Sequence, residues 1–412
     1  MEHCQTIDNC FACGSNNLNL VFDLGTQPLA NSYKLSPTDD ELMFPLGINS
    51  CQHCHHVQLT HLINPDLLFK DYAYMSGVSK TGLEFFKWFA EMSFNYFPDK
   101  PTTILDIGCN DGSQLNYYKE HGLETYGVDP AENLFTITSQ NHNIICNYFK
   151  KGLIDKQFDI VTVQNAFAHN SNQLELLENI KPNVKDTGYI FATTSQADML
   201  LNGEFDTIYH EHISFYNINS MNELCKRAGL NLVDVIMHPI HGRSYIFVIS
   251  KTKNNEKHIQ LLIDEERAKG LYSNELLVKF KNQAIDTVAK VKALVDDCRA
   301  KGIPVVGYTA PAKSSTFLNF ADIKTEFIIE DTPLKQNKYT PGTNIPILGI
   351  SAFDTIDQIP TVCFIIFAWN FYDEIKEKIS HQRALFKNTP ERSDMFVKYF
   401  PKFIVDDTPA NK

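Results

Sequence analysis

Two patterns of apolar and polar positions alternate along the chain and predict mainly α/β structure. Between residues 101 and 200, short apolar runs such as TTILDIG, FDIVTV and GYIFATTS alternate with segments of helical period. Apolar strands separated by helices are typical of a parallel sheet with crossover helices. The pattern therefore predicts a parallel α/β domain in the middle of the chain.

Helical periodicity dominates the segments on either side. Aromatic residues recur every three or four positions in GLEFFKWFAEMSF, which predicts core-facing helix between residues 67 and 97. A long helical pattern after residue 254 breaks near Gly270 and then gives way to alternating strands and helices. This part of the chain predicts a second, smaller α/β domain. The longest apolar run, VCFIIFAWNFY from Val362, is too short to cross a bilayer and predicts a buried strand leading into a helix.

Length and charge narrow the class of protein. A chain of 412 residues exceeds what one hydrophobic core usually supports, so we expect two or three domains. The net charge of −12 argues against nucleic-acid partners, which reward clustered Lys and Arg. The first residues show no signal-peptide pattern. We expect a cytoplasmic protein with no nucleic-acid or membrane partner, either a monomer or a weak homo-oligomer.

Cysteine spacing predicts a structural zinc site. Two Cys-x-x-Cys pairs lie near the N-terminus, and their thiolates could hold one Zn²⁺ about 2.3 Å from each sulfur. The predicted ligands are Cys10, Cys13, Cys51 and Cys54. A redox pair would need one such motif inside a strand–helix unit, and neither pair has that context.

Three histidines crowd the second pair: His53, His55 and His56. Any of them could replace a thiolate, but four cysteines already complete a tetrahedral site. We therefore expect these histidines to be surface residues. The six other cysteines have no partner spacing and are expected to be mostly small buried hydrophobes.

A glycine-rich turn, DIGCNDG, follows a predicted strand and opens a predicted helix. Gly108 would let the backbone approach a ligand closely, and Asp129 ends the next predicted strand, where an acid accepts ribose hydroxyls. The turn lacks the G-x-G-x-x-G spacing of pyrophosphate binders, so S-adenosylmethionine fits better than NAD. The candidate cofactor-binding residues are Asp106, Gly108, Asn110, Gly112, Asp129, Pro130, Asn165 and Phe167. Phe167 is equally well explained as a core residue.

The segment TIYHEHISFY, residues 207–216, contains two histidines, one glutamate and two tyrosines within ten positions. A histidine with its ordinary pKa of about 6.5 suits proton removal near neutral pH. On a strand, His210 and His212 would share a face and could chelate a metal with a third ligand elsewhere. Polar residues satisfied by backbone in a loop are the structural alternative. We rank proton transfer above both.

A second ligand site is predicted in the C-terminal part. GYTAPAKSSTF follows a predicted strand at 303–306 and opens a helix, whose N-terminus suits a diphosphate. The candidate substrate-binding residues are Lys313, Ser314, Lys335, Tyr339 and Arg243. Each is also explained as a cap, a turn residue or a solvated charge.

In this order and spacing, the motifs resemble the sugar C-methyltransferase family, which includes deoxysugar 3-C-methyltransferases. Besides those above, the resemblance rests on DYAYMSGVSKT, GVDPAEN, NAFAHN, HGRSYIFV and DTPLKQNKYTPGTNIPI, and it covers nearly the whole chain. It implies an N-terminal zinc-binding domain (1–66), a central Rossmann-like S-adenosylmethionine domain (67–253) and a smaller C-terminal Rossmann-like α/β domain (254–412). The C-terminal domain would contribute to nucleotide-sugar binding.

The resemblance also implies a reaction, methyl transfer to a carbon of a nucleotide-linked 4-keto-deoxysugar after proton abstraction beside the ketone. The residues that it implies are Tyr74, His169, Tyr209, Glu211 and His212. His212 is the candidate base, with Glu211 as an orienting group or the base itself. Family members often read His-Gly-Gly-Ser-Leu-Arg where this chain has HGRSYI, which leaves the sugar and nucleotide open. Transfer to oxygen or nitrogen, or a non-catalytic nucleotide-sugar-binding module, are the alternatives.

Overall fold

The computed structural model describes residues 3–69, 77, 80–195, 199–240, 243–385 and 392–407. The chain forms two compact units, each built from three segments. The first comprises Met1–Leu20, Ile48–Asp198 and Glu211–Tyr272. The second comprises Val21–Gly47, Met199–His210 and Ser273–Lys412.

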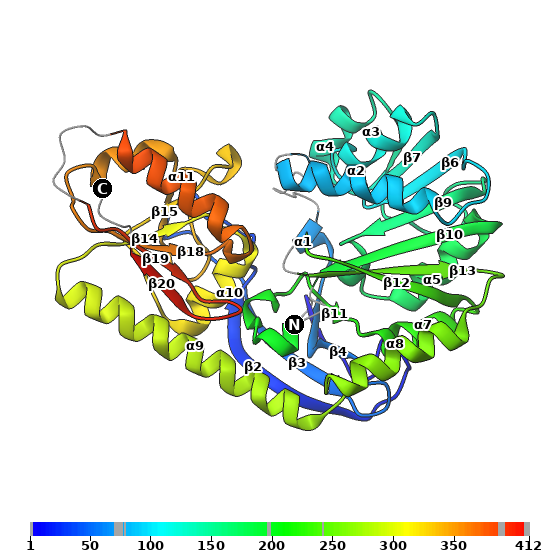
Figure 1. The fold of residues 1–412 in the computed structure, drawn as a ribbon, viewed down its shortest axis with the longest axis horizontal. Coiled ribbons are helices and arrows are strands. Elements are labelled where there is room, and N and C mark those ends of the chain that lie inside the picture. Colours follow the sequence, from blue (N-terminus) through cyan, green and yellow to red (C-terminus); the bar gives the residue numbers. More distant parts are fainter. Residues whose placement is uncertain are drawn as a thin grey trace. The chain divides into compact units, whose positions relative to one another are not determined.

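A seven-stranded sheet in the order β12-β13-β10-β9-β6-β7-β8 organises the first unit (Figure 1). Its strands are β6 (Thr103–Ile107), β7 (Glu124–Asp129), β8 (Asn143–Cys146), β9 (Phe158–Gln164), β10 (Val184–Ser195), β12 (Asn231–His238) and β13 (Ser244–Ser250). Strands β8, β7, β6, β9 and β10 run parallel, β13 pairs antiparallel with β10, and β12 pairs antiparallel with β13. The predicted parallel α/β domain is confirmed.

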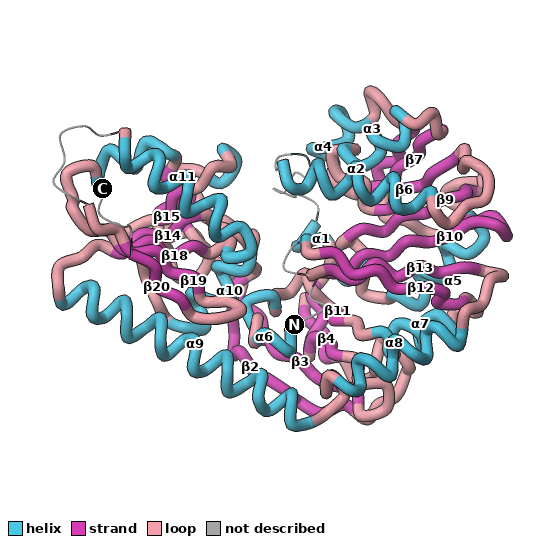
Figure 2. Tube along the Cα trace, viewed as in Figure 1, coloured by secondary structure: helices cyan, strands magenta, loops and turns pink. Residues whose placement is uncertain are grey.

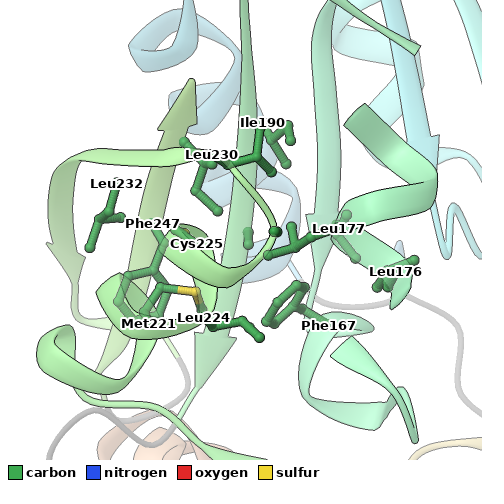
Figure 3. Close-up of a cluster of buried hydrophobic side chains, with 14 of the residues drawn as sticks. Phe167, Leu176, Leu177, Ile190, Met221, Leu224, Cys225, Leu230, Leu232 and Phe247 are labelled. Carbon is green, nitrogen blue, oxygen red and sulfur yellow. The ribbon is translucent and has the colours of Figure 1, made fainter. Parts of the chain in front are cut away.

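Helices cover both faces of this sheet because neighbouring strand residues point to opposite sides. Ile104 packs with helix α2 (Lys80–Phe94), whereas Leu105 joins the cluster formed with helices α5 (Gln173–Ile180), α7 (Ile218–Arg227) and α8 (Glu256–Ala268). Figure 3 shows part of that second cluster, including Met221, Leu224 and Cys225 of α7. Helices α3 (Ser113–Glu120) and α4 (Glu132–Thr138) follow β6 and β7.

A smaller four-stranded sheet has the order β11-β4-β3-β2. Its strands are β2 (Leu18–Pro28), β3 (Met43–Cys51), β4 (Val57–Leu59) and β11 (Ser214–Phe215). The short strands β1 (Cys4–Thr6) and β5 (His61–Ile63) pair antiparallel, and helix α1 (Asp66–Phe69) follows. Strand β11 brings part of TIYHEHISFY against β4, directly after the second cysteine pair.

The second unit contains another seven-stranded sheet, in the order β16-β17-β15-β14-β18-β19-β20. The strands are β14 (Val305–Tyr308), β15 (Ile328–Ile329), β16 (Lys338–Tyr339), β17 (Pro346–Leu348), β18 (Cys363–Ile366), β19 (Met395–Lys398) and β20 (Ile404–Asp407). Strands β17, β15, β14, β18 and β19 run parallel. The expected α/β character of this region is confirmed.

The second unit's helices are α6 (Met199–Asn202), α9 (Asn274–Ala300), α10 (Ala312–Ala321) and α11 (Tyr372–Ala384). Helix α9 is one uninterrupted helix (Figure 2), and the predicted break lies between the end of α8 and Asn274. Within the described ranges, no helix combines the length and apolar character that a bilayer crossing requires.

Candidate functional site

The four predicted zinc ligands come together in the first unit. Their sulfur atoms all lie within 4.8 Å of one another, with 3.5 Å between Cys10 Sγ and Cys54 Sγ and between Cys13 Sγ and Cys51 Sγ. A disulfide bond requires an S–S distance of about 2.0 Å. Four sulfur atoms that each lie about 2.3 Å from one Zn²⁺ are farther apart from one another than that. The contact with Cys54 lowers the pKa of Cys10, and the same contact raises the pKa of Cys54. A bound Zn²⁺ would stabilise all four thiolates together.

Helix α7 holds the two cysteine turns in place. Arg227 Nη1 donates to the carbonyl oxygens of Phe11 (3.1 Å) and Ala12 (2.8 Å) in the first turn. The Asn219 side-chain amide donates to the carbonyl of Cys54 at 3.1 Å in the second. The predicted zinc site is therefore packed into the same core as the large sheet.

The expectation that the neighbouring histidines lie on the surface is wrong for His56. His53 is exposed and His55 is half-buried against Tyr272, but the His56 side chain has no exposed surface. The reason is that β4 begins at the next residue and places the His56 ring 4.4 Å from the Tyr216 ring.

The glycine-rich turn has the backbone geometry that its sequence predicts. Gly108 follows β6 with φ +77°, and Gly112, also at φ +77°, immediately precedes α3. Asp129, at the end of β7, accepts hydrogen bonds from the backbone N–H groups of Asn110 (2.8 Å) and Ala131 (2.9 Å). These bonds fix the acid beside the turn, where a ribose would lie in an adenosine site.

A cavity of about 540 Å³ opens at this edge of the sheet, within the size range of small-molecule sites. Six predicted cofactor-binding residues line it: Asp106, Gly108, Asn110, Asp129, Pro130 and Asn165. Burial raises the pKa of Asp106 to about 7, although a hydrogen bond from Thr162 opposes the shift. The cavity, the close-approach glycine and the ribose-type acid together fit S-adenosylmethionine.

Two predicted cofactor residues do not line this cavity. Gly112 turns the chain into α3, and a Cβ there would lie 2.8 Å from Thr138 Cγ2. Phe167 is fully buried in the apolar cluster that includes Leu177 and Met221 (Figure 3). Its position favours the core alternative.

Sequence reasoning missed several residues that line the cavity, namely Asn64, Phe69, Phe85, Gln114, Asn147 and Tyr148. Asn147 and Tyr148 directly follow β8, at the edge where ligands bind in parallel sheets. Their position directly after a strand was the feature of the sequence that could have identified them. The side chains of Gln114 and Gln164 contact each other beside the turn.

The structure brings together two predicted catalytic residues, His169 and His212. Their ring centroids lie 5.2 Å apart, and the His169 ring also stacks on Phe69 at 5.8 Å. His169 lines the cavity, whereas His212 is buried and is not itself among the lining residues. Glu211 is buried and Tyr209 half-buried. Tyr74 lies outside the described residues.

The metal-chelating alternative for His210 and His212 assumed a strand that does not form there. Residues 209–213 make a turn and a loop, and β11 begins only at Ser214. The only group of three or more metal-ligating side chains found among the described residues is the four-cysteine cluster.

The predicted diphosphate residues lie in two different units. In the second unit, Lys313 and Ser314 are in the first turn of α10, and Lys313 Nζ lies 4.2 Å from the centre of the Trp369 ring. Lys335 Nζ donates to the carbonyl of Ala310 at 3.0 Å, and Tyr339 lies in β16. Arg243 is exposed and belongs to the first unit.

We expect Gly108→Ala to weaken cofactor binding. An added Cβ would lie 2.6 Å from Ala166 Cβ, and alanine is also strained at φ +77°. Gly122 is the matched control because it has φ +80° with no atom within 4 Å of an added Cβ, so Gly122→Ala adds only strain of about 1 kcal/mol. Calorimetry should show at least about tenfold weaker S-adenosylmethionine binding for Gly108→Ala than for Gly122→Ala. Equal affinities would contradict the placement of the cofactor at this turn.

We also expect acid to destabilise the fold through His169. Burial lowers the pKa of His169 to about 4, whereas an unfolded histidine titrates near 6.5. Between these values the unfolded chain binds a proton that the folded chain excludes, so stability falls as the pH falls from 6.5 towards 4. At pH 5 the loss is about 2 kcal/mol.

Urea unfolding at pH 7 and pH 5 measures this loss. His169→Gln should lose about 2 kcal/mol less than the wild type between the two pH values. The rest of the pH dependence should remain, because burial lowers the pKa of His56 and His142 to about 4 as well. Equal losses in variant and wild type would mean that the pKa of His169 is not depressed.

Comparisons with known proteins agree with these sites. Residues 10–69 match the family described as "Putative zinc binding domain", residues 80–235 match "Methyltransferase domain", and residues 239–386 match "C-methyltransferase C-terminal domain". The chain is 28% identical to the C-methyltransferase NovU of Streptomyces niveus over 406 residues, which cover 93% of this chain and 94% of that protein.

Other similarities cover less than half of the chain. The ubiquinone biosynthesis O-methyltransferase of Coxiella burnetii is 24% identical over 160 residues, covering 33% of this chain and 68% of that protein. The plantazolicin methyltransferase BpumL, solved in complex with SAH, is 16% identical with a TM-score of 0.36 and covers 42% of this chain and 86% of its own. Three domain matches in sequence order, together with a relative that aligns over nearly the whole of both chains, indicate the family. The chain belongs to the C-methyltransferase family that joins an N-terminal zinc-binding domain to a C-methyltransferase C-terminal domain, and it is an S-adenosylmethionine-dependent C-methyltransferase.

Proposed function

We propose that the protein methylates a carbon of a nucleotide-linked 4-keto-deoxysugar. The observation that carries the proposal is the pair of imidazoles, His169 and His212, placed beside the cavity that also holds the glycine turn and Asp129. Carbon is a poor nucleophile until it loses a proton, and a sugar carbon becomes acidic only beside a ketone. The site must therefore contain a base and hydrogen-bond donors for an enolate oxygen.

S-adenosylmethionine supplies an electrophilic methyl group when it is bound. Gly108, Asn110 and Asp129 would hold it, with the glycine allowing close backbone contact and the acid accepting ribose hydroxyls. The protein's other task is to orient the sugar so that its carbanion faces the cofactor.

His212 is the proposed base, with Glu211 next to it as an orienting group or an alternative base. His212 lies in a loop and has little exposed surface. His169 suits a different role. Because burial lowers its pKa to about 4, His169 stays neutral near pH 7 and can donate a hydrogen bond to the enolate oxygen. Tyr209 and Tyr74 are the further proposed donors.

The C-terminal unit is proposed to contribute to nucleotide binding. Strand β14 is followed by α10, whose N-terminus carries Lys313 and Ser314. Backbone N–H groups and a lysine at this position suit a diphosphate. Lys335, Tyr339 and Arg243 are the other proposed contacts.

Product analysis tests the proposal against its alternatives. The purified protein is incubated with ¹³C-methyl-labelled S-adenosylmethionine and a panel of nucleotide-linked 4-keto-deoxysugars, and the product is examined by NMR. We expect the label on a carbon of the sugar ring. Label only on oxygen or nitrogen would refute the enolate mechanism, and no turnover with any sugar would refute the proposed class of substrate.

A further inference from the structure

We infer that His56, beside the zinc site, is a positioning residue that fixes the segment carrying His212. This inference rests on the proposed function of His212 as the base. His56 follows the last zinc ligand, Cys54, by two residues, and its imidazole is completely buried. Nothing in the cysteine cluster requires this imidazole, because four thiols already supply the ligands.

The backbone of Ile213 is held from two sides, immediately after His212. Its carbonyl accepts a hydrogen bond from the N–H of Leu59 in β4 at 2.9 Å. Its N–H donates to the carbonyl of Ala168 at 3.0 Å, immediately before His169. The hydrogen bond between Ile213 and Ala168 therefore lies one residue away from each of the two imidazoles, His212 and His169. Any shift of β11 against β4 would change the distance between these rings.

Side chains fix the register of β11 against β4. Ser214, which pairs with Gln58, is fully buried, and its hydroxyl lies 3.2 Å from His56 Nε2. The same hydroxyl accepts a hydrogen bond from the Gln173 amide of α5 at 3.0 Å. A serine hydroxyl with two fixed partners holds β11 in one position along the strand direction.

Loss of this hydrogen-bonded contact should be costly because all of its residues are buried. His56, Ser214 and Gln173 each have no exposed surface, so losing one partner leaves a buried polar group unsatisfied. The centre of the His56 ring also lies 4.4 Å from that of Tyr216, the residue directly after β11. The imidazole therefore contacts two residues of the catalytic segment from the zinc side.

A purely structural role would lower stability without a specific effect on the chemical step. A positioning role predicts something different. If His56 sets the place of His212, its loss should lower kcat while the KM for S-adenosylmethionine and the zinc content stay unchanged. A displacement of about 1 Å can reduce a rate by up to about 100-fold.

The test uses four variants of the full-length protein. His56→Leu removes the polar contact, whereas His56→Gln keeps an amide at about the reach of Nε2. Ser214→Ala removes the other partner with a smaller change in volume, which guards against misfolding. His53→Leu is the matched control, because His53 is also close to the second cysteine pair, between Cys51 and Cys54, but is exposed.

Four quantities are measured for each variant: bound zinc, the KM for S-adenosylmethionine, the kcat of methylation, and the rate of sugar C–H exchange in deuterated water. We expect exchange and kcat to fall between about 10- and 100-fold in His56→Leu and Ser214→Ala. His56→Gln should recover most of the rate, His53→Leu should match the wild type, and all four should bind one zinc.

Each failure points to a different part of the argument. If the wild type itself catalyses no exchange, the proposed function fails. If the wild type exchanges and both His56→Leu and Ser214→Ala exchange equally fast, the positioning role is refuted. It is also refuted if the loss of rate is accompanied by loss of zinc and is restored by excess Zn²⁺, because the residue would then serve the metal site alone.

Discussion

His212→Ala is expected to lower the kcat of sugar methylation by about 10²- to 10⁴-fold, the contribution typical of a general base. The side chain is buried, with its ring 5.2 Å from that of the cavity-lining His169. Proton abstraction precedes bond formation, so the variant should also fail to exchange the C–H proton beside the ketone in deuterated water. S-adenosylmethionine affinity should change little, because His212 does not line the cofactor cavity.

His210→Ala provides the matched control. His210 is also a buried histidine of the same ten-residue segment, and its Nε2 lies 3.3 Å from the carbonyl oxygen of Pro45. Its removal should cost stability without stopping exchange. Glu211→Gln separates the two candidate bases, because it keeps the shape of the side chain and removes its basicity. Normal exchange by His212→Ala together with none by Glu211→Gln would transfer the role of base to Glu211.

The cofactor turn could be predicted from sequence because its signals are local. The strand before Gly108, the positive φ that a glycine tolerates, and the helix after Gly112 all depend on neighbouring residues. The cysteine cluster was predictable for a similar reason, since each pair forms its own turn. Only the approach of the two turns needs the rest of the fold.

The burial of His56 depends on contacts that local spacing does not contain. Its partner Ser214 lies 158 residues away, and only the pairing of β11 with β4 brings them together. The same holds for the turn at residues 209–213. Ile208, just before it, is fixed by a hydrogen bond from Thr316 Oγ1 to its carbonyl at 2.8 Å. The metal-chelating alternative for His210 and His212 required a strand there, and the structure forms a turn and a loop instead.

The structure supports the predicted cofactor site more than the predicted nucleotide site. Six of the predicted cofactor residues share one cavity, and their arrangement follows from the carboxyl ends of neighbouring parallel strands. Within the second unit, Lys313 and Lys335 contact Trp369 and Ala310. The proposed nucleotide contacts, and the three-domain division at residues 66 and 253, remain predictions.

Removal of the zinc ligand Cys51 is expected to have the largest effect on stability. Structural zinc sites of four thiolates contribute about 10–16 kcal/mol of apparent binding free energy, comparable with the whole stability of a domain. Cys51→Ser should therefore lose about one bound zinc per chain and unfold the N-terminal region. Metal analysis and thermal unfolding measure both effects.

Cys225→Ser is the matched control for the loss of a buried thiol. Cys225 lies in the same apolar cluster as the zinc ligands and is equally buried, but it is not one of them. It should keep its zinc and lose only a small fraction of its stability. Because β4 begins three residues after Cys54 and pairs with β11, loss of zinc should also stop C–H exchange at the sugar. A metal-free protein that stays folded and active would refute the structural role of zinc.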